Sequence, residues 1–302
     1  MRSLLRAEEL TEGSIEAVLD RAQAFANGQS LPTLNAAMVN LFFEPSTRTS
    51  LSFQMAAHRL GIKLLDFSLD TSSVCKGESF LDTLSTIDSL GVDIAVIRHR
   101  DPWPDTPGLE TLQMRLINAG SGVLEHPTQA LLDALTMQQA FSTLRGRSVV
   151  IVGDAAHSRV ARSNAAVLRK LGAHVFFAGP PEYRPNDLPA HVSWVDGDLD
   201  YAIRKCDAVM MLRIQHERHE TSFNIRNYNE QYGMNQRRLH LMKKDAILLH
   251  PGPVNRGVEI AADIIDHPRC RINQQVANGV SVRMALLEMC LQEGRHEKLA
   301  SA

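Results

Sequence analysis

The sequence lacks the features that identify secreted, membrane or zinc-binding proteins. Its four cysteines are scattered without a C-x-x-C pair, so neither a disulfide framework nor a zinc site is predicted. No apolar run approaches the ~20 residues needed to cross a bilayer, and the N-terminal segment turns acidic before any signal-like core develops. With 34 acidic against 32 basic residues, a broad nucleic-acid-binding surface is disfavoured. We therefore expect a soluble protein of the reducing cytoplasm, with no nucleic-acid or membrane partner.

Several common catalytic motifs are also missing. There is neither a G-x-S-x-G elbow nor a Walker loop, which disfavours the commonest hydrolase and nucleotide-hydrolysing functions. The segment 153–172 follows a predicted strand and opens a helix, but it lacks the second and third glycines of a dinucleotide fingerprint. The run 216–220, HERHE, is not an H-E-x-x-H motif. The sequence thus predicts no metal and no cofactor, and its chemistry must come from the positioning of substrates.

What the sequence does contain is a repeated pattern of apolar strand, polar loop and amphipathic helix. In the first half, the predicted strands are 38–43, 63–69, 93–98 and 121–125, with helices starting at about residues 48, 78, 109 and 127. In the second half, the predicted strands are 148–153, 173–179, 207–212 and 245–250. Such alternation indicates parallel sheets. We therefore expect an α/β protein with two doubly wound parallel-sheet domains in tandem.

The domain boundary is predicted within residues 143–148. Residues 1–142 would form the first domain and 143–280 the second, with a C-terminal helix, 281–302, packing back on the first. Ligands of open parallel sheets bind beyond the carboxyl ends of the strands. Seven loops at these ends carry hydrogen-bonding or anion-binding side chains, which is more than solubility would explain.

The loop after the first predicted strand contains three hydroxyl residues and an arginine, from Ser46 to Thr49. One of the hydroxyls could simply cap the following helix. A helix N-terminus with several hydroxyls and a guanidinium would also bind a phosphate-sized anion, and these residues alone leave both interpretations open. Arg98, at the end of the third strand, either offers a second fork to that anion or returns the chain to solvent.

Other loops fit ligand binding at the same strand ends. His126 precedes a helix, whose N-terminus disfavours the imidazolium, so we expect a neutral ring that donates an N–H to a carbonyl oxygen, with Gln129 beside it. The polar loop 71–79 is either a mobile connection or a lid that brings Ser72 and Lys76 onto an anionic ligand. In the second half, one arginine follows the first strand, and an arginine and a glutamine follow the third. These residues indicate a carboxylate site and are Arg159, Arg213 and Gln215.

Taken together, the motifs resemble those of the aspartate carbamoyltransferase family, nearly from end to end. The segments that carry the resemblance are Ser46–Ser50, Lys76–Glu78, Arg98–His99, His126–Gln129, Arg159, Arg213–Gln215 and His250–Pro253. The resemblance implies condensation of carbamoyl phosphate with L-aspartate to N-carbamoyl-L-aspartate and phosphate, an early step of pyrimidine (UMP) synthesis.

The resemblance also implies a role for each residue. Carbamoyl phosphate would be bound by Ser46, Thr47, Arg48, Thr49, Ser72, Arg98, His126 and Gln129. Aspartate would be bound by Lys76, Arg159, Arg213 and Gln215, and the backbone of Pro251 and Gly252 would also bind substrate. The catalytic residues would be Arg48, Thr49, Lys76, Arg98 and His126. Ser72 and Lys76 would enter from a neighbouring subunit of a homotrimer with shared active sites.

Two alternatives remain beside this interpretation. Ornithine carbamoyltransferases share the phosphate loop but carry a cysteine-bearing H-C-L-P turn, whereas this turn reads HPGP, with Gly252 where the family pattern has a larger residue. Arg213 and Gln215 suit a second carboxylate and would repel an ornithine ammonium. A catalytically silent sensor of a phosphorylated metabolite is disfavoured because both half-sites are present. Whether regulatory or dihydroorotase subunits bind the trimer does not follow from the sequence.

Overall fold

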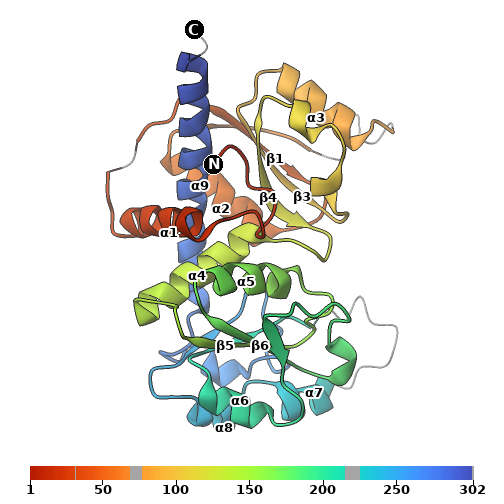
Figure 1. Ribbon diagram of the computed structural model, residues 1–302, viewed down its shortest axis with the longest axis vertical. Coiled ribbons are helices and arrows are strands. Elements are labelled where there is room, and N and C mark those ends of the chain that lie inside the picture. The colour runs from red at the N-terminus through yellow and green to blue at the C-terminus, as the bar shows by residue number, and fades with distance from the viewer. Residues whose placement is uncertain (31, 69–76, 215–224, 301–302) are drawn as a thin grey trace. The chain divides into compact units, whose positions relative to one another are not determined.

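The computed structural model describes residues 1–30, 32–68, 77–214 and 225–300, and the chain divides into two compact units (Figure 1). The first unit comprises Met1–Leu132 and Val276–Ala302, and the second comprises Asp133–Gln275. Each unit contains one sheet in which all paired strands are parallel. The predicted class of two parallel-sheet α/β domains is therefore confirmed.

The sheet of the first unit has the order β2-β1-β3-β4. Its strands are β1 Ala37–Phe42, β2 Lys63–Leu65, β3 Ile94–His99 and β4 Arg115–Ser121. The prediction of a strand at 121–125 is wrong, because the strand ends at Ser121 and the chain then turns. The sequence pattern misled because Asn118, a buried polar residue, interrupts the apolar run of β4. Its side chain is satisfied by Leu5 O at 2.7 Å and Gly120 N at 2.8 Å.

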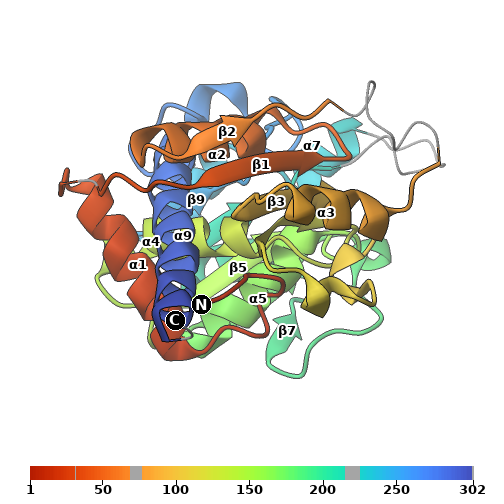
Figure 2. The ribbon, with the colours of Figure 1, turned by 90° about the horizontal axis from the view of Figure 1, so that it is seen from above.

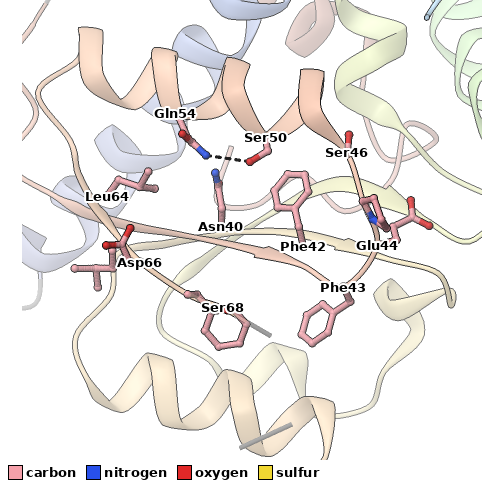
Figure 3. A pocket seen from close by; sticks show the side chains of 13 residues that line it. Asn40, Phe42, Phe43, Glu44, Ser46, Ser50, Gln54, Leu64, Asp66 and Ser68 are labelled. Carbon is pink, nitrogen blue, oxygen red and sulfur yellow. Dashed lines mark hydrogen bonds between the residues drawn. The ribbon is translucent and has the colours of Figure 1, made fainter. Parts of the chain in front are cut away.

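Helices cover both faces of this sheet. They are α1 Glu12–Ala26, α2 Thr47–Arg59, α3 Phe80–Ser89, the first part of α4 Pro127–Phe141 and most of α9 Ile272–Ala300. Figures 2 and 3 show β1 between α2 and α3. Leu84 and Ile87 of α3 join Val39 and Leu41 of β1 in one buried cluster. The expected helix from residue 109 is wrong, since only a 3-10 turn, Leu109–Thr111, forms there.

The C-terminal helix packs on the first unit, as expected. It begins at Ile272 rather than near residue 281, and its residues from Val276 onward belong to that unit. Within it, Glu288 accepts a hydrogen bond from Arg21 Nη2 of α1 at 2.7 Å. The boundaries between the two units thus fall within helices, at Leu132/Asp133 in α4 and at Gln275/Val276 in α9.

The sheet of the second unit has the order β7-β6-β5-β8-β9. Its strands are β5 Ser148–Val152, β6 His174–Ala178, β7 Val192–Trp194, β8 Ala208–Met211 and β9 Ile247–Leu249. Its other helices are α5 Arg159–Lys170, α6 Leu199–Lys205, α7 Ile225–Tyr232 and α8 Gln236–Leu241. Four strands lie where they were predicted, whereas β7, a three-residue edge strand, was not predicted.

The core of the second unit lies between its sheet and the helices α6 and α8. Val150, Val209 and Leu248 come from three neighbouring strands and pack with Leu199 of α6 and Leu239 of α8. Figure 1 shows α5 on the opposite side of β5 and β6. Within the described part of the chain, no helix combines the length and the apolar composition needed to cross a membrane.

Candidate active site

In the first unit, the predicted anion-binding residues converge at the carboxyl ends of β1 and β3. The two strands are parallel neighbours, and Phe42 pairs with Arg98. The amide of Phe43 donates to the carbonyl oxygen of Arg98 at 2.8 Å, which continues the pairing into the loop. Arg98 therefore lies directly beside the loop that leads from β1 to α2.

The start of α2 is built differently from that of most helices in the described chain. Ser46 occupies the N-cap position, with φ −161° and ψ 95°, but its side chain makes no capping hydrogen bond to any described residue. Side-chain caps do start five other described helices, and they come from Thr11, Ser79, Ser158, Asp198 and Asn235. The interpretation of the Ser46 hydroxyl as a cap is therefore wrong, and its role as a ligand-binding hydroxyl stays a prediction.

The other predicted site residues of this loop, Thr47, Arg48 and Thr49, lie in the first turn of α2 and differ in their exposure to solvent. Thr47 and Arg48 are exposed, whereas Thr49 is only 6% exposed. Exposed hydroxyl and guanidinium groups at the positive end of a helix dipole suit an anion that arrives from solvent. The buried Thr49 suits a contact to a less accessible part of a ligand.

The guanidinium of Arg98 is held by a carboxylate of the same loop. Arg98 Nε lies 2.7 Å from Glu44 Oε1, and the two side chains are only 12% and 18% exposed. Arg98 Nη1 also donates to Ala119 O of β4 at 3.3 Å. Because Glu44 lies two residues before Ser46, this pair fixes the Arg98 guanidinium next to the N-terminus of α2. The alternative in which Arg98 merely returns the chain to solvent is not favoured by its burial.

His126 and Gln129 lie at the start of α4, beyond β4, which neighbours β3 in the sheet. Ser121 donates through its backbone N–H to Glu125 O at 2.9 Å, closing the turn that leads to His126. The His126 and Gln129 side chains are buried, at 5% and 7% exposure. The predicted carbamoyl phosphate residues of the described chain thus come from the ends of three adjacent strands.

His99, next to Arg98, has a structural role. Its ring contacts Phe43 and Phe80, with centroid distances of 5.0 and 5.5 Å. Desolvation by burial lowers the pKa of His99, although the Asp101 carboxylate opposes this effect. The ring nitrogen Nδ1 accepts a hydrogen bond from Asp101 N at 2.9 Å. A neutral His99 ring therefore packs against Phe43 and Phe80, and His99 follows Arg98 directly in the sequence.

A pocket of about 460 Å³ is lined by residues of β1, β2, α2 and the loop between β1 and α2 (Figure 3). Asn40 and Phe42 point from β1 toward α2, where Gln54 donates to Ser50 Oγ at 3.1 Å. Ser46 is the one predicted site residue in its lining. The pocket therefore adjoins the loop between β1 and α2 but does not coincide with the predicted anion site.

In the second unit, the predicted substrate-binding residues follow β5, β8 and β9, which are adjacent in the sheet. Arg159 is the first residue of α5, and the preceding Ser158 accepts a hydrogen bond from Ala161 N at 3.2 Å. Arg213 follows β8 and is half-buried. Pro251 and Gly252 follow β9. The structure therefore brings these residues to one edge of the second sheet.

The turn at His250–Pro253 explains the glycine that departs from the family pattern. Gly252 has a φ of +67°, in the left-handed region that glycine adopts without a steric penalty. Its amide donates to His250 Nδ1 at 2.8 Å, and His250 itself is 1% exposed. The peptide bond between Gly252 and Pro253 is cis. The positive φ of this turn thus explains why a glycine stands at position 252.

Three predicted site residues, Ser72, Lys76 and Gln215, lie outside the described residues. Two acidic residues were missed by the sequence analysis. Glu44 pairs with Arg98, and Glu259 accepts hydrogen bonds from two loops of the second unit. In the sequence, we looked for basic side chains and hydrogen-bond donors that could bind an anion. We therefore did not identify the carboxylates that hold the groups around the site in place. In the described part of the chain, no group of three or more His, Cys, Asp or Glu side chains is arranged to hold a metal ion.

Comparison with protein families divides the chain at nearly the same place as its two sheets. Residues 2–139 match the aspartate/ornithine carbamoyltransferase carbamoyl-P binding domain. Residues 145–290 match the aspartate/ornithine carbamoyltransferase Asp/Orn binding domain. The two matches include the loop between β1 and α2 in the first domain and the loops after β5, β8 and β9 in the second.

Individual relatives match over almost the whole chain. The aspartate carbamoyltransferase catalytic subunit of Lactiplantibacillus plantarum is 45% identical over 307 aligned residues, covering 100% of this chain and 97% of the relative. That of Listeria welshimeri is 43% identical, covering 97% of each chain. The crystal structure of aspartate transcarbamoylase from Trypanosoma cruzi with carbamoyl aspartate and phosphate is 30% identical, with a TM-score of 0.86 and coverage of 95% and 94%. The chain therefore belongs to the aspartate/ornithine carbamoyltransferase family.

Proposed function

We propose that this carbamoyltransferase acts on L-aspartate, giving N-carbamoyl-L-aspartate and phosphate in an early step of pyrimidine (UMP) synthesis. The relatives named as aspartate carbamoyltransferase catalytic subunits support this acceptor. A Trypanosoma cruzi relative of similar fold has been solved with carbamoyl phosphate and aspartate. The observation that carries the proposal is the Arg98 guanidinium beside a helix N-terminus whose serine does not cap it.

The first unit would bind carbamoyl phosphate. Ser46, Thr47, Arg48 and Thr49 would hold the phosphate at the positive end of α2, and Arg98 would provide a second guanidinium. His126 and Gln129, at the start of α4, would contact the carbamoyl group. Their burial excludes water from that end of the substrate and strengthens each hydrogen bond.

The second unit would bind aspartate, with Arg159, Arg213 and Gln215 on its carboxylates and the backbone of Pro251 and Gly252 on its amino end. Ser72 and Lys76 would come from a neighbouring subunit. The repulsion between two anionic substrates is the main obstacle to the reaction. Arginine side chains of the protein that bind each substrate offset this repulsion. Holding the two reactants in place can lower the activation barrier of the reaction by about 7 to 11 kcal/mol.

The chemistry needs no covalent intermediate on the enzyme. The aspartate amine attacks the carbamoyl carbon, and Thr49, Arg98 and His126 stabilise the oxyanion of the tetrahedral intermediate. The C–O bond to phosphate then breaks. The departing phosphate takes the proton of the amine, so that a protein base is not required.

The proposed homotrimer has support in the surface of the first unit. Four large apolar residues of α2 and β2 are exposed to solvent, namely Leu51 at 57%, Met55 at 45%, Leu64 at 36% and Leu65 at 43%. Apolar side chains grouped in this way are typical of a surface that another subunit covers. Cytoplasmic location is proposed because the described cysteines, Cys206, Cys270 and Cys290, are all free.

The test is a two-substrate assay in which purified protein and carbamoyl phosphate are incubated with aspartate or with ornithine. We expect carbamoyl aspartate to form and citrulline not to form, because Arg213 repels the ornithine ammonium. A bisubstrate mimic with one phosphonate and two carboxylates should bind and inhibit competitively against carbamoyl phosphate. Binding of carbamoyl phosphate without turnover of aspartate would reject the proposed function.

A further inference from the structure

A buried carboxylate joins two loops of the second unit. Glu259 is 0% exposed. Its Oε1 accepts hydrogen bonds from Ile214 N and from Asn255 Nδ2, both at 2.8 Å, and its Oε2 accepts one from Asn255 N at 2.8 Å. Three N–H groups from two different loops therefore converge on a single carboxylate.

The two loops are those that carry proposed aspartate contacts. Ile214 directly follows Arg213 in the loop after β8, and Asn255 lies three residues after Gly252 in the loop after β9. Asn255 Nδ2 also donates to Ile214 O at 3.3 Å, so the Ile214 residue is held through both its N–H and its C=O. A displacement of Glu259 would therefore move the backbone next to Arg213.

A second layer of buried polar groups holds the turn at His250. Because His250 Nδ1 accepts from Gly252 N, the proton of the neutral ring is on Nε2, which lies 3.9 Å from Glu259 Oε2. The backbone amide of His250 donates to Gln275 Oε1 at 2.9 Å. Gln275 in turn donates to Asp133 Oδ1 at 2.7 Å. Gln275 thus links the turn to α4, and the His250 ring lies close to Glu259.

Stability alone does not account for a carboxylate in this place. Burial raises the pKa of Glu259, and the hydrogen bonds from Ile214 and Asn255 oppose that shift. A buried charge costs free energy unless it is fully hydrogen-bonded, and apolar side chains of similar size often stabilise a core better. A carboxylate fixes the geometry of the two loops, because its oxygens accept hydrogen bonds from three N–H groups in defined directions.

We propose that Glu259 is a positioning residue for the second substrate, because it holds the loops of Arg213 and Gly252 in the conformation that binds the aspartate. The inference rests on the proposed function and deepens it. Glu259 does not touch the substrate in this proposal. It acts through Ile214 and Asn255.

The test variant is Glu259→Gln, which keeps the size of the side chain. Either orientation of the new amide places its NH₂ group against an N–H donor, that of Asn255 or that of Ile214. We expect the KM for aspartate to rise about 10- to 100-fold, as for the loss of a hydrogen bond to a charged group. The KM for carbamoyl phosphate should stay within about two-fold of the wild type, because its proposed contacts lie in the first unit. Affinity for succinate, an unreactive dicarboxylate, should fall in parallel when measured by calorimetry.

Three further variants separate a positioning role of Glu259 from a purely structural one. Glu288→Gln changes a buried glutamate of the first unit that pairs with Arg21, and it should lower the thermal unfolding temperature without changing the KM for aspartate. Glu259→Asp keeps the charge and should restore part of the aspartate affinity. If Glu259→Gln does not fold, Asn255→Ala decides, because it removes both hydrogen bonds of the side chain, to Glu259 Oε1 and to Ile214 O, and leaves the backbone amide.

The outcomes are distinct. A folded Glu259→Gln protein with an unchanged KM for aspartate overturns the inference, as does an equal rise for both substrates. If only Asn255→Ala can be measured, an unchanged KM for aspartate overturns it, and a several-fold rise supports it. A wild-type protein that neither turns over aspartate nor binds succinate rejects the proposed function itself, and the inference with it.

Discussion

Each unit has a helix with a serine at its N-cap and an arginine in its first turn, but the two serines differ in their contacts. Ser158 caps α5 through Ala161 N, so its hydroxyl is used within the protein. Ser46 occupies the same position in α2 and makes no cap to any described residue. The difference supports the proposal that the Ser46 hydroxyl binds a ligand, whereas the Ser158 hydroxyl caps α5.

The units also differ in how their loops are fixed. In the first unit, the candidate residues from Ser46 to Thr49 are contiguous and begin a regular helix, so local structure alone sets their positions. In the second unit, Arg159 begins α5, whereas Arg213 and Gly252 lie on loops joined by Glu259, which is distant from Arg213 in the sequence. Substitutions in the first unit should therefore act directly on substrate, whereas those in the second act through supporting contacts as well.

The largest expected effect is that of Arg48→Ala. The exposed guanidinium at the start of α2 is proposed to bind the phosphate and to stabilise the charge that develops on it. Its loss should lower kcat/KM by about 10³-fold, comparable to the loss of one preorganised donor. The free energy of unfolding should change by less than about 0.5 kcal/mol, because the side chain is exposed. Steady-state kinetics and thermal unfolding measure the two quantities.

The control for Arg48→Ala is Arg169→Ala, which removes an exposed arginine from the last turn of α5. It should leave kcat/KM unchanged. Comparable activities of the two variants would contradict the assignment of the phosphate site to α2.

Arg98→Lys is expected to lower kcat/KM by about 100-fold. Lysine keeps the charge but loses the planar fork that contacts both Glu44 and Ala119 O, so it cannot hold an anion in the same orientation. Arg100→Lys, two residues further along and exposed, is the matched control and should behave as the wild type. Wild-type kinetics of the Arg98 variant would show that only charge matters here.

Arg159→Ala sharpens the comparison between the two units. Removal of a proposed carboxylate contact should raise the KM for aspartate about 10- to 100-fold and leave the affinity for carbamoyl phosphate unchanged. Both are accessible from kinetics with each substrate varied in turn. Arg162→Ala, one turn along α5, removes an arginine that pairs with Asp187 instead, and it should change neither value. An equal loss of affinity for both substrates would end the assignment of one substrate to each unit.

Features set by local sequence could be predicted, whereas features set by contacts between distant residues could not. The strands β1, β3, β5 and β8 and the loop at Ser46 depend on local patterns, and they were predicted at nearly the right residues. β4 was misplaced because the partners that satisfy its buried Asn118 include Leu5, which is far away in the sequence. The role of Glu259 could not be predicted either, because its partners are brought together only by the fold.

The smallest expected effect concerns the scaffold of the second unit, away from the loops. Asp200 accepts hydrogen bonds from Arg237 and from Arg238 Nε, the latter at 2.8 Å. The hydrogen bond from Arg237 is the main reason that the pKa of Asp200 is lowered, with Arg238 adding to it and burial opposing it. Asp200→Asn should lower the free energy of unfolding at pH 7 by about 1 to 2 kcal/mol, because one charge-assisted bond is lost from a partly exposed site. The KM for aspartate should not change.

The pH dependence of this effect gives an independent check. A carboxyl with a lowered pKa in the folded state stabilises the protein above its unfolded pKa, near the ordinary value of 3.8, and this contribution is lost as the pH falls through the folded pKa. The difference in stability between wild type and Asp200→Asn should therefore be constant near neutrality and shrink in acid below pH 3.8. Asp196→Asn is the matched control, since Asp196 is 81% exposed and lies 3.7 Å from Arg184, and it should change stability little at any pH. If Asp200→Asn instead raised the KM for aspartate, the loops of the second unit would depend on its distant scaffold, and the buried contacts of Glu259 would not be sufficient to hold them.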